Sequence, residues 1–269
     1  MKKILTLILC GFSIYGFSQT DLEKNDLRGK IKMLEEKKSK AMIRMNHVEG
    51  YQQEYHKKVD YNIAGFLVSE QFFDEKNLPT YTATYTYDSD GKLKAKDMDS
   101  YNNFLKIDER YEYDGQTITI KTTENDVPVL EKKLLYEGSN LVEDRSRNLE
   151  EEDIFINEKN EYNAKNQLIK KTVDYDNGKY EINYRYNDLG LVVEEEMKSG
   201  NALVSKKIRQ FNEKGDMTAE KMFDKDLKLK YDVSILYEYD AQNNWVKRTH
   251  YNANLDAPIT NTTRKIVYY

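Results

Sequence analysis

The chain has 269 residues, of which 33% are charged and 39% hydrophobic, and its formal net charge at pH 7 is −5. This mild acidity, spread along the chain, argues against nucleic acid and against an anionic membrane surface as partners. One cysteine excludes a disulfide scaffold, and the absence of any run of about twenty apolar residues argues against a helical membrane span.

The first residues predict an export signal. Lys2 and Lys3 provide the positive start, and an apolar stretch follows from Ile4. Gly16 and Ser18 are the small residues that signal cleavage requires. We therefore expect an exported protein, either periplasmic or extracellular.

Residues 1–18 are the predicted signal peptide, with cleavage before Gln19. Cleavage there leaves 251 residues without cysteine and moves the formal charge from −5 to −7. Acylation at Cys10, as in a lipoprotein, is the weaker alternative because the bulky Leu9 precedes that cysteine.

Residues 19–60 form the N-terminal segment that precedes the first repeat. The abundance of Leu, Glu, Lys and Met between Asp21 and Met45 favours a helix by intrinsic propensity. Gly29 interrupts that pattern, and one repeat length counted back from Tyr61 predicts a strand pair with its turn at Asn46 to Gly50. We interpret the segment as a strand pair, with a helix that caps the first sheet edge as the alternative.

Residues 61–269 predict a domain of β-hairpin repeats. An aromatic residue followed by Asp, Asn or Glu recurs eight times, at spacings of 26, 26, 23, 26, 24, 25 and 28 residues. A near-constant period of this size is typical of a repeat architecture. The aromatic anchors are Tyr61, Tyr87, Tyr113, Tyr136, Tyr162, Tyr186, Phe211 and Tyr239.

Each anchor is followed by turn chemistry, as in YTYDSDGKL (Tyr85 to Leu93). The Asn or Asp side chain can accept a hydrogen bond from the backbone two residues on, and a residue with positive φ then returns the chain. Asn tolerates positive φ best after Gly, so Asn166 and Asn243 predict the same turn. Glycine occupies this position at Gly65, Gly91, Gly190 and Gly215.

Apolar and polar residues alternate on both sides of these turns, as at Tyr180, Ile182 and Tyr184, which predicts strands. A second polar break halves each repeat, so the sequence predicts an all-β fold: a long antiparallel meander of about sixteen strands from hairpin repeats of about 25 residues. Because adjacent strands twist by about 20 to 25°, we expect a spiral or an open barrel-like sheet, with the tyrosine-rich face inside and Lys and Glu outside. A closed barrel is the alternative.

Three further motifs accompany the repeats: LRGKIK (Leu27 to Lys32), NNWVKR (Asn243 to Arg248) and RKIVYY (Arg264 to Tyr269). Together with these motifs, the repeat resembles the Tyr-Asp (YD) repeat of the rearrangement-hot-spot family, in the form found in short secreted Bacteroidota proteins. The resemblance covers nearly the whole chain after the signal. It implies a shell-like β-strip, which in large members can enclose a toxic C-terminal domain. Nothing in this chain matches that cargo.

The histidines do not predict a metal site. His47 and His56 would approach each other across the first hairpin, while His250 is distant in sequence, and neither a cysteine nor a third ligand is placed to complete a site. We expect all three to be strand histidines that face solvent.

Acidic side chains offer weak candidates for chemistry. Asp88 to Gly91 and Asp174 to Gly178 resemble calcium loops, but the repeat turns already require Asp and Gly there. The acidic runs Glu150 to Asp153 and Glu194 to Glu196 would suit a glycosidase only if two carboxylates were specifically placed. We therefore predict no catalytic, cofactor-binding or metal-ligating residue.

The tyrosines are the remaining candidate for binding. Tyrosine and the single tryptophan, Trp245, can bind sugars or extended peptides by stacking and hydrogen bonding. The tyrosines recur at the period of the repeat, however, which favours packing between neighbouring repeats. Any site is therefore expected where the period breaks: before Tyr61, in the acidic runs or at Trp245.

The sequence as a whole favours an exported, non-enzymatic β-repeat scaffold or binding module of the cell envelope, without a cofactor. Its partner would be an unknown polypeptide or glycan. The alternatives are a secreted or periplasmic hydrolase and a shell or immunity-like protein associated with a toxin system. Because an open sheet exposes a strand at each end, edge-to-edge pairing into a homodimer is also expected to be available.

Overall fold

The computed structural model describes residues 20–25, 27–45, 47–149, 155–175, 178–253, 255 and 257–269. The predicted signal peptide (1–18) and the acidic run at 150–153 lie outside the described residues. So do Asn46, at the start of the predicted first turn, and Asp176, in the second calcium-like segment.

The described residues form one antiparallel sheet of eighteen strands, in which each strand pairs with its neighbours in sequence. The predicted all-β meander is confirmed, with eighteen strands in place of about sixteen. The strands are β1 (Ile31–Arg44), β2 (His47–Tyr61), β3 (Leu67–Phe73), β4 (Pro79–Tyr87), β5 (Leu93–Ser100), β6 (Leu105–Asp114), β7 (Thr117–Glu124), β8 (Val127–Glu137), β9 (Asn140–Asn148), β10 (Phe155–Tyr162), β11 (Leu168–Tyr175), β12 (Gly178–Tyr186), β13 (Val192–Ser199), β14 (Ala202–Phe211), β15 (Met217–Asp224), β16 (Leu229–Tyr239), β17 (Trp245–Asn252) and β18 (Pro258–Tyr268).

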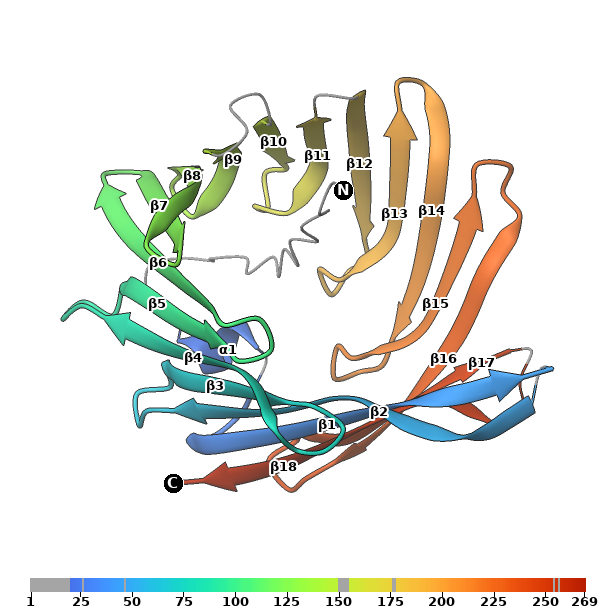
Figure 1. Cartoon of the computed structure of the whole chain (residues 1–269). Coiled ribbons are helices and arrows are strands. Elements are labelled where there is room, and N and C mark those ends of the chain that lie inside the picture. Colours follow the sequence, from blue (N-terminus) through green and yellow to red (C-terminus); the bar gives the residue numbers. More distant parts are fainter. Residues whose placement is uncertain are drawn as a thin grey trace.

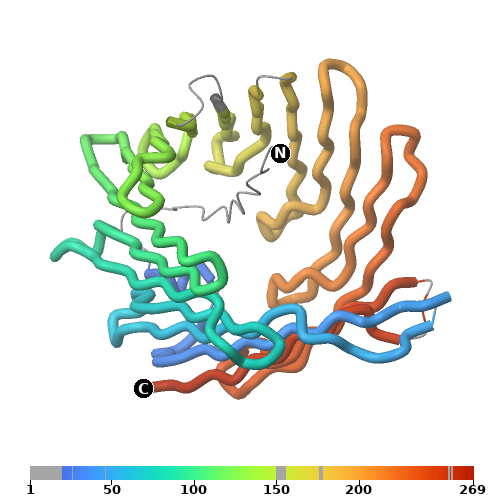
Figure 2. Tube along the Cα trace, in the orientation of Figure 1, coloured from blue at the N-terminus to red at the C-terminus, as the bar shows by residue number. Residues whose placement is uncertain are grey.

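The first and last strands pair with each other and close the sheet into a barrel (Figures 1 and 2). β1 and β18 are antiparallel, in a register that runs from Ile31 opposite Tyr268 to Lys40 opposite Thr260. The barrel-like sheet is therefore confirmed, and it is closed rather than open. The two strands that would be free edges in an open sheet are joined, so edge-to-edge pairing of two copies would require this contact to open.

The N-terminal segment contributes one helical turn and two strands. The helix α1 (Asp21–Lys24) begins with a capping box between Thr20 and Glu23. Its Leu22 amide donates to the Gly65 carbonyl, which places α1 against the first repeat turn. No helix in the part of the chain that the structure describes is long and apolar enough to cross a membrane.

The repeat turns have the predicted conformation. Asn166 and Asn243 have φ values of 58° and 62°, as their position in the repeat requires. In the first turn, the Asn62 side-chain oxygen accepts hydrogen bonds from the backbone amides of Ala64 and Phe66, both at 3.0 Å. The glycines at the same position also have positive φ: Gly65 (90°), Gly91 (78°), Gly190 (77°) and Gly215 (88°).

The two faces of the sheet differ in burial. In β16, Val233 and Ile235 lie on one face and are 1% and 2% exposed. Leu236 lies on the other face and is 60% exposed. Val233 and Ile235 share their face with the anchor tyrosine Tyr239, since strand side chains alternate. Inward-facing side chains of a closed sheet converge, which explains why this face is the more buried one. We call this face, which carries the anchor tyrosines, the inner wall.

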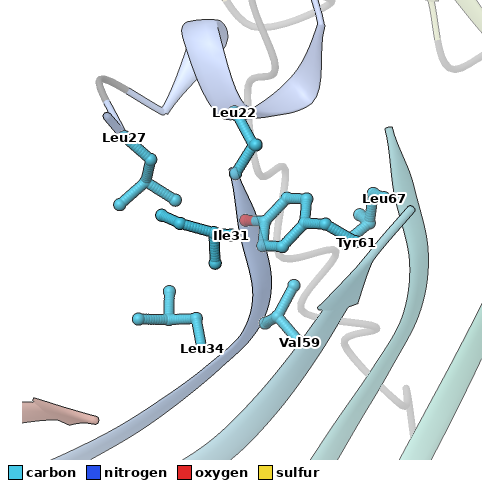
Figure 3. Close-up of a cluster of buried hydrophobic side chains, with 7 residues drawn as sticks. All are labelled: Leu22, Leu27, Ile31, Leu34, Val59, Tyr61 and Leu67. Atoms are coloured by element: carbon cyan, nitrogen blue, oxygen red, sulfur yellow. The ribbon is translucent and has the colours of Figure 1, made fainter. Parts of the chain in front are cut away.

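The barrel is not filled by a single core. Among the described residues, extensive contacts join only strands that are neighbours in the sheet. Buried apolar side chains form two small clusters, one beneath α1 around Ile31 and Tyr61 (Figure 3) and one around Ile118 and Leu134. Barrels of about 16 to 18 strands are too wide for side chains to fill. The inner wall therefore lines a lumen.

Several anchor tyrosines link consecutive repeats through their hydroxyl groups. The Tyr113 hydroxyl donates to the Leu93 carbonyl at 2.9 Å, and the Tyr186 hydroxyl donates to the Leu168 carbonyl at 2.7 Å. Tyr162 makes the same kind of bond to Leu141. Each acceptor lies near the start of the preceding strand, so these tyrosines act in packing, as their period predicts.

The second polar break of one repeat uses the same turn with an unfavourable residue. The Asp224 side chain accepts hydrogen bonds from the amides of Asp226 and Lys228, and Leu227 takes the positive φ, at 57°. A left-handed conformation costs a residue with a Cβ about 1 to 2 kcal/mol. Leu227 is 61% exposed, so little packing offsets that cost.

Replacing Leu227 with Gly is therefore expected to stabilise the barrel by about 0.5 to 1 kcal/mol, measured by urea unfolding. The matched control is Leu236→Gly, at a 60% exposed position inside β16, which should destabilise because glycine weakens a strand interior. Equal effects of the two changes would show that the turn at Leu227 is not strained.

Candidate binding surface on the inner wall

The three sequence motifs outside the repeat consensus meet where the barrel closes. Asn244, which is 2% exposed, accepts a hydrogen bond from the Arg28 amide at 2.8 Å. Its side-chain amide donates to the Arg28 carbonyl at 2.7 Å and to the Tyr268 hydroxyl at 2.8 Å. We call the contact of residues 27–30 and β1 with β17 and β18 the closure seam.

Close packing at the seam requires a glycine. Gly29 has a φ of +87°, and a Cβ there would lie 3.2 Å from the Tyr268 ring. Beside it, the Tyr269 amide donates to the Lys30 carbonyl, and the Tyr269 hydroxyl donates to the Tyr61 carbonyl. The motifs that carried the family resemblance therefore have a physical role in closing the sheet.

Trp245 lies on the inner wall beside the seam, and two arginines stack on it. The guanidinium carbon of Arg264 is 3.4 Å from the indole centroid, and that of Arg248 is 4.8 Å away. Tyr237 contacts the same ring edge-on. Cation–π contacts of this kind occupy the faces that a sugar would use, so Trp245 acts first as a platform for the two arginines.

A buried carboxylate holds the more closely stacked arginine. Glu36 is 3% exposed and accepts a hydrogen bond from Arg264 Nε at 2.6 Å. It also accepts from the Tyr55 hydroxyl, and Lys57 Nζ lies 3.7 Å away. Burial opposes ionisation of Glu36, but Lys57 and Arg264 outweigh it, so the pKa of Glu36 is lowered.

A cavity of about 70 Å³ adjoins this cluster beside Asn25 and Leu27. Its polar lining comes from Asn25, Lys57, Glu70 and Arg264. A volume of this size holds only a few water molecules, so the cavity does not serve an organic ligand.

A second cluster of charged side chains lies on the inner wall and was not predicted from the sequence. Lys132, Asp144, Glu158 and Lys171 lie side by side on β8 to β11, with Asp144 directly opposite Glu158. Lys132 pairs with Asp144 at 2.7 Å and Lys171 with Glu158 at 2.8 Å. Burial raises the pKa of Asp144, and the Glu158 charge adds to that effect. Strand alternation was the signal that would have grouped them.

The predicted acidic run at 194–196 lies on a strand, and its carboxylates are ion-paired. Glu195 faces inward and pairs with Lys207 and Arg209, both at 2.9 Å, while Glu194 and Glu196 on the other face share Lys206. Burial opposes ionisation of Glu195, but hydrogen bonds from Lys207 and Arg209 outweigh it and lower its pKa. A general acid requires a raised pKa, so Glu195 does not suit that role.

The histidine predictions are partly wrong. His47 and His56 lie on the same strand, β2, and not across a hairpin from each other. His56 is only 4% exposed, because its ring bonds to Glu35 and Asn77 and stacks on Phe73. Within the described residues, no group of three or more His, Cys, Asp or Glu is arranged to hold a metal ion.

The first calcium-like segment is accounted for by its turn. The Asp88 side chain accepts hydrogen bonds from the backbone amides of Asp90 and Lys92, both at 2.9 Å. This is the turn bond that every clear repeat makes.

Comparisons with known proteins give matches to solved structures alone; no family model and no curated protein matches the chain. A porin-like protein from Bacteroides uniformis has a TM-score of 0.49 and 11% identity, over 89% of this chain and 99% of that chain. A porin-like protein from Bacteroides vulgatus has a TM-score of 0.42 and 16% identity, over 74% and 93%. A chain of the TcdB2–TccC3–Cdc42 complex has a TM-score of 0.36 and 13% identity, over 80% and 14%. At these scores the matches carry no argument about function, and membership of the YD-repeat family stays a prediction.

Changing Asn244 to Ala is expected to destabilise the barrel by about 3 kcal/mol, because it removes three hydrogen bonds of a side chain that is 2% exposed. Urea unfolding measures the change. Asn201→Ala, at an exposed turn position, is the control and should lie within about 0.5 kcal/mol of the unmodified chain. A similarly small change for Asn244→Ala would contradict the claim that Asn244 stabilises the closure seam.

The seam also predicts a pH dependence. The pKa of Glu36 is lower in the folded state than its ordinary value of 4.5, so its contribution to stability is full above that pH and is lost as pH falls through the folded pKa. Glu36→Gln should therefore be less stable than the unmodified chain at pH 7, and the difference should shrink below about pH 4.5. Thermal unfolding between pH 3 and 7 tests this, with the exposed Glu238→Gln as the control. A difference independent of pH would contradict it.

Proposed function

We propose that the chain is an exported, non-enzymatic barrel of the cell envelope whose inner wall binds a polypeptide or glycan. The observation that carries the proposal is an accessible aromatic pair on the inner wall. Tyr175, at the end of β11, is 43% exposed and contacts Tyr180 edge-on at a ring separation of 6.1 Å.

This pair differs from the anchor tyrosines in position. Neither Tyr175 nor Tyr180 is an anchor, and both lie at the mouth opposite the Asn-x-x-Gly turns, where β11 connects to β12. Exposed tyrosine rings offer an apolar face together with a hydroxyl, which suits both sugars and extended peptides. Packing between repeats does not account for the exposed ring of Tyr175 beside the half-buried Tyr180.

The outer face supports a location in water. It carries ion pairs between exposed side chains of adjacent strands, such as Lys121 with Glu112 on β7 and β6, and Lys247 with Glu238 on β17 and β16. Lipid-facing barrel surfaces instead carry an apolar band. A charged outer face thus favours the periplasm or the extracellular medium for this chain.

Binding tests should use the chain after signal removal, residues 19–269. We expect specific retention of a component from an envelope extract or of one class of structure on a glycan array. Tyr175→Ala should weaken that binding about tenfold, corresponding to about 1.4 kcal/mol. The matched control is Tyr101→Ala, an equally exposed tyrosine outside the inner wall (48%), which should leave binding unchanged.

No specific retention in either experiment would contradict the proposal. Hydrolysis of a glycoside panel that is abolished by Asp144→Asn would instead support the hydrolase alternative, because the raised pKa of Asp144 beside Glu158 is what an acid catalyst requires.

A further inference from the structure

Four buried polar atoms without a hydrogen-bond partner gather on β17 and β18. They are Arg248 Nε, His250 Nε2, Thr260 Oγ1 and Thr262 Oγ1. The four residues form two directly opposed pairs, Arg248 with Thr262 and His250 with Thr260. All four therefore lie next to one another on the inner wall, since Arg248 also opposes the inner-wall residue Tyr237.

Such a cluster is unusual in a folded protein. Most buried polar side chains have a partner, and Thr262, which is 0% exposed, has no access to bulk water in this structure. The remaining unpartnered buried side-chain atoms among the described residues belong to Asp108, Asn157 and Asn160 on other strands. Four neighbouring atoms in need of partners indicate one shared partner.

The charge of the cluster is positive. No carboxylate in the described part of the chain lies within ion-pair distance of Arg248, whereas Arg264, on the same indole, pairs with Glu36 at 2.6 Å. Lys38 on β1 lies opposite Thr262, although it also pairs with Glu54 at 2.9 Å. Arg248 is half-buried, and its side chain bonds to the neutral Tyr237 hydroxyl while its Nε has no partner. Its positive charge is therefore the one in the cluster that an anion would offset.

His250 supports the same interpretation. Burial, followed by the charges of Arg248 and Lys38, lowers the pKa of His250 to about 4. Its ring is therefore neutral at pH 7, and in one tautomer Nε2 carries a proton that it can donate. The hydroxyls of Thr260 and Thr262 rotate and can also donate.

We propose that Arg248, His250, Thr260 and Thr262 form a binding site for an oxyanion, namely the carboxylate, sulfate or phosphate group of a ligand in the lumen. Charge-assisted hydrogen bonds from a guanidinium and two hydroxyls suit such a group. A metal cation would be repelled by Arg248, and a neutral sugar would leave that charge unpaired. The inference rests on the proposed function and names the ligand class for the same inner wall.

An oxyanion in the lumen would meet Arg248 and His250 first, and would reach the buried Thr262 hydroxyl only after those side chains move. Arg248 and His250 are only half-buried, and Arg248 stacks on Trp245 less closely than Arg264 does. Arg248 can thus turn toward an oxyanion while Arg264 stays with Glu36. Because Trp245 is the single tryptophan of the chain, its fluorescence reports this movement.

The test titrates the chain after signal removal with sodium sulfate, phosphate and galacturonate at constant ionic strength, and follows Trp245 fluorescence and the heat of binding. We expect a saturable change with at least one salt, and the salt that binds distinguishes the three oxyanions. Arg248→Lys keeps the charge but loses the Nε donor, and should weaken binding at least tenfold. The control is Arg185→Lys, on the outer face and paired with Glu194, which should bind as the unmodified chain does.

Thr262→Val is a second variant, in which a methyl group replaces the hydroxyl and the shape of the side chain is kept. It should weaken binding at least fivefold and raise the melting temperature of the ligand-free chain, because it removes an unpartnered buried hydroxyl. If Arg248→Lys does not fold, Thr262→Val decides the question.

The proposal is overturned if none of the three salts gives a saturable change, or if both site variants bind as the unmodified chain does. Retention of a glycan or peptide without oxyanion binding would overturn this site and leave the proposed function standing. Oxyanion binding without any such retention would support this site and count against the proposed function.

Discussion

The pairing of β1 with β18 is the interaction on which the rest of the structure depends. Every other strand pair in the described chain joins neighbours in sequence and forms through a short connection. The seam alone joins the two ends of the chain, so its formation carries a large loop-closure cost in entropy. The hydrogen bonds of the buried Asn244 and Glu36 and the close approach of Gly29 to Tyr268 offset that cost. Closure then gives the sheet an inner wall.

Local features of the fold followed from the sequence because local physics controls them. A turn that needs positive φ accepts Asn as well as Gly, and Asn166 and Asn243 have that conformation. Closure did not follow, because it depends on small twists summed over eighteen strands. Burial of His56 also escaped prediction, since it depends on Asn77, which approaches from a turn 21 residues away.

The repeat period separated structural residues from candidate functional ones, but only in part. Anchor tyrosines such as Tyr113 and Tyr186 donate hydrogen bonds from their hydroxyls to the preceding strand. Tyr175 lies outside the period and is exposed. The sequence directed attention to Trp245, and the structure places it beside the cluster of Arg248 and its neighbours. Strand alternation would have aligned Arg248 with His250, but their pairing with Thr260 and Thr262 depends on a register that a bulge near Tyr251 alters.

Two arginines share one indole, and their surroundings assign them different roles. Arg264 has a buried carboxylate partner and belongs to the seam. Arg248 has the same platform without a carboxylate partner, and its Nε is a buried donor without an acceptor; local departures from polar satisfaction are expected at functional sites. Because the platform is common to both, a ligand that binds Arg248 in the closed barrel stabilises the closed state by mass action. If the proposed oxyanion site exists, ligand binding and barrel closure would therefore be thermodynamically linked.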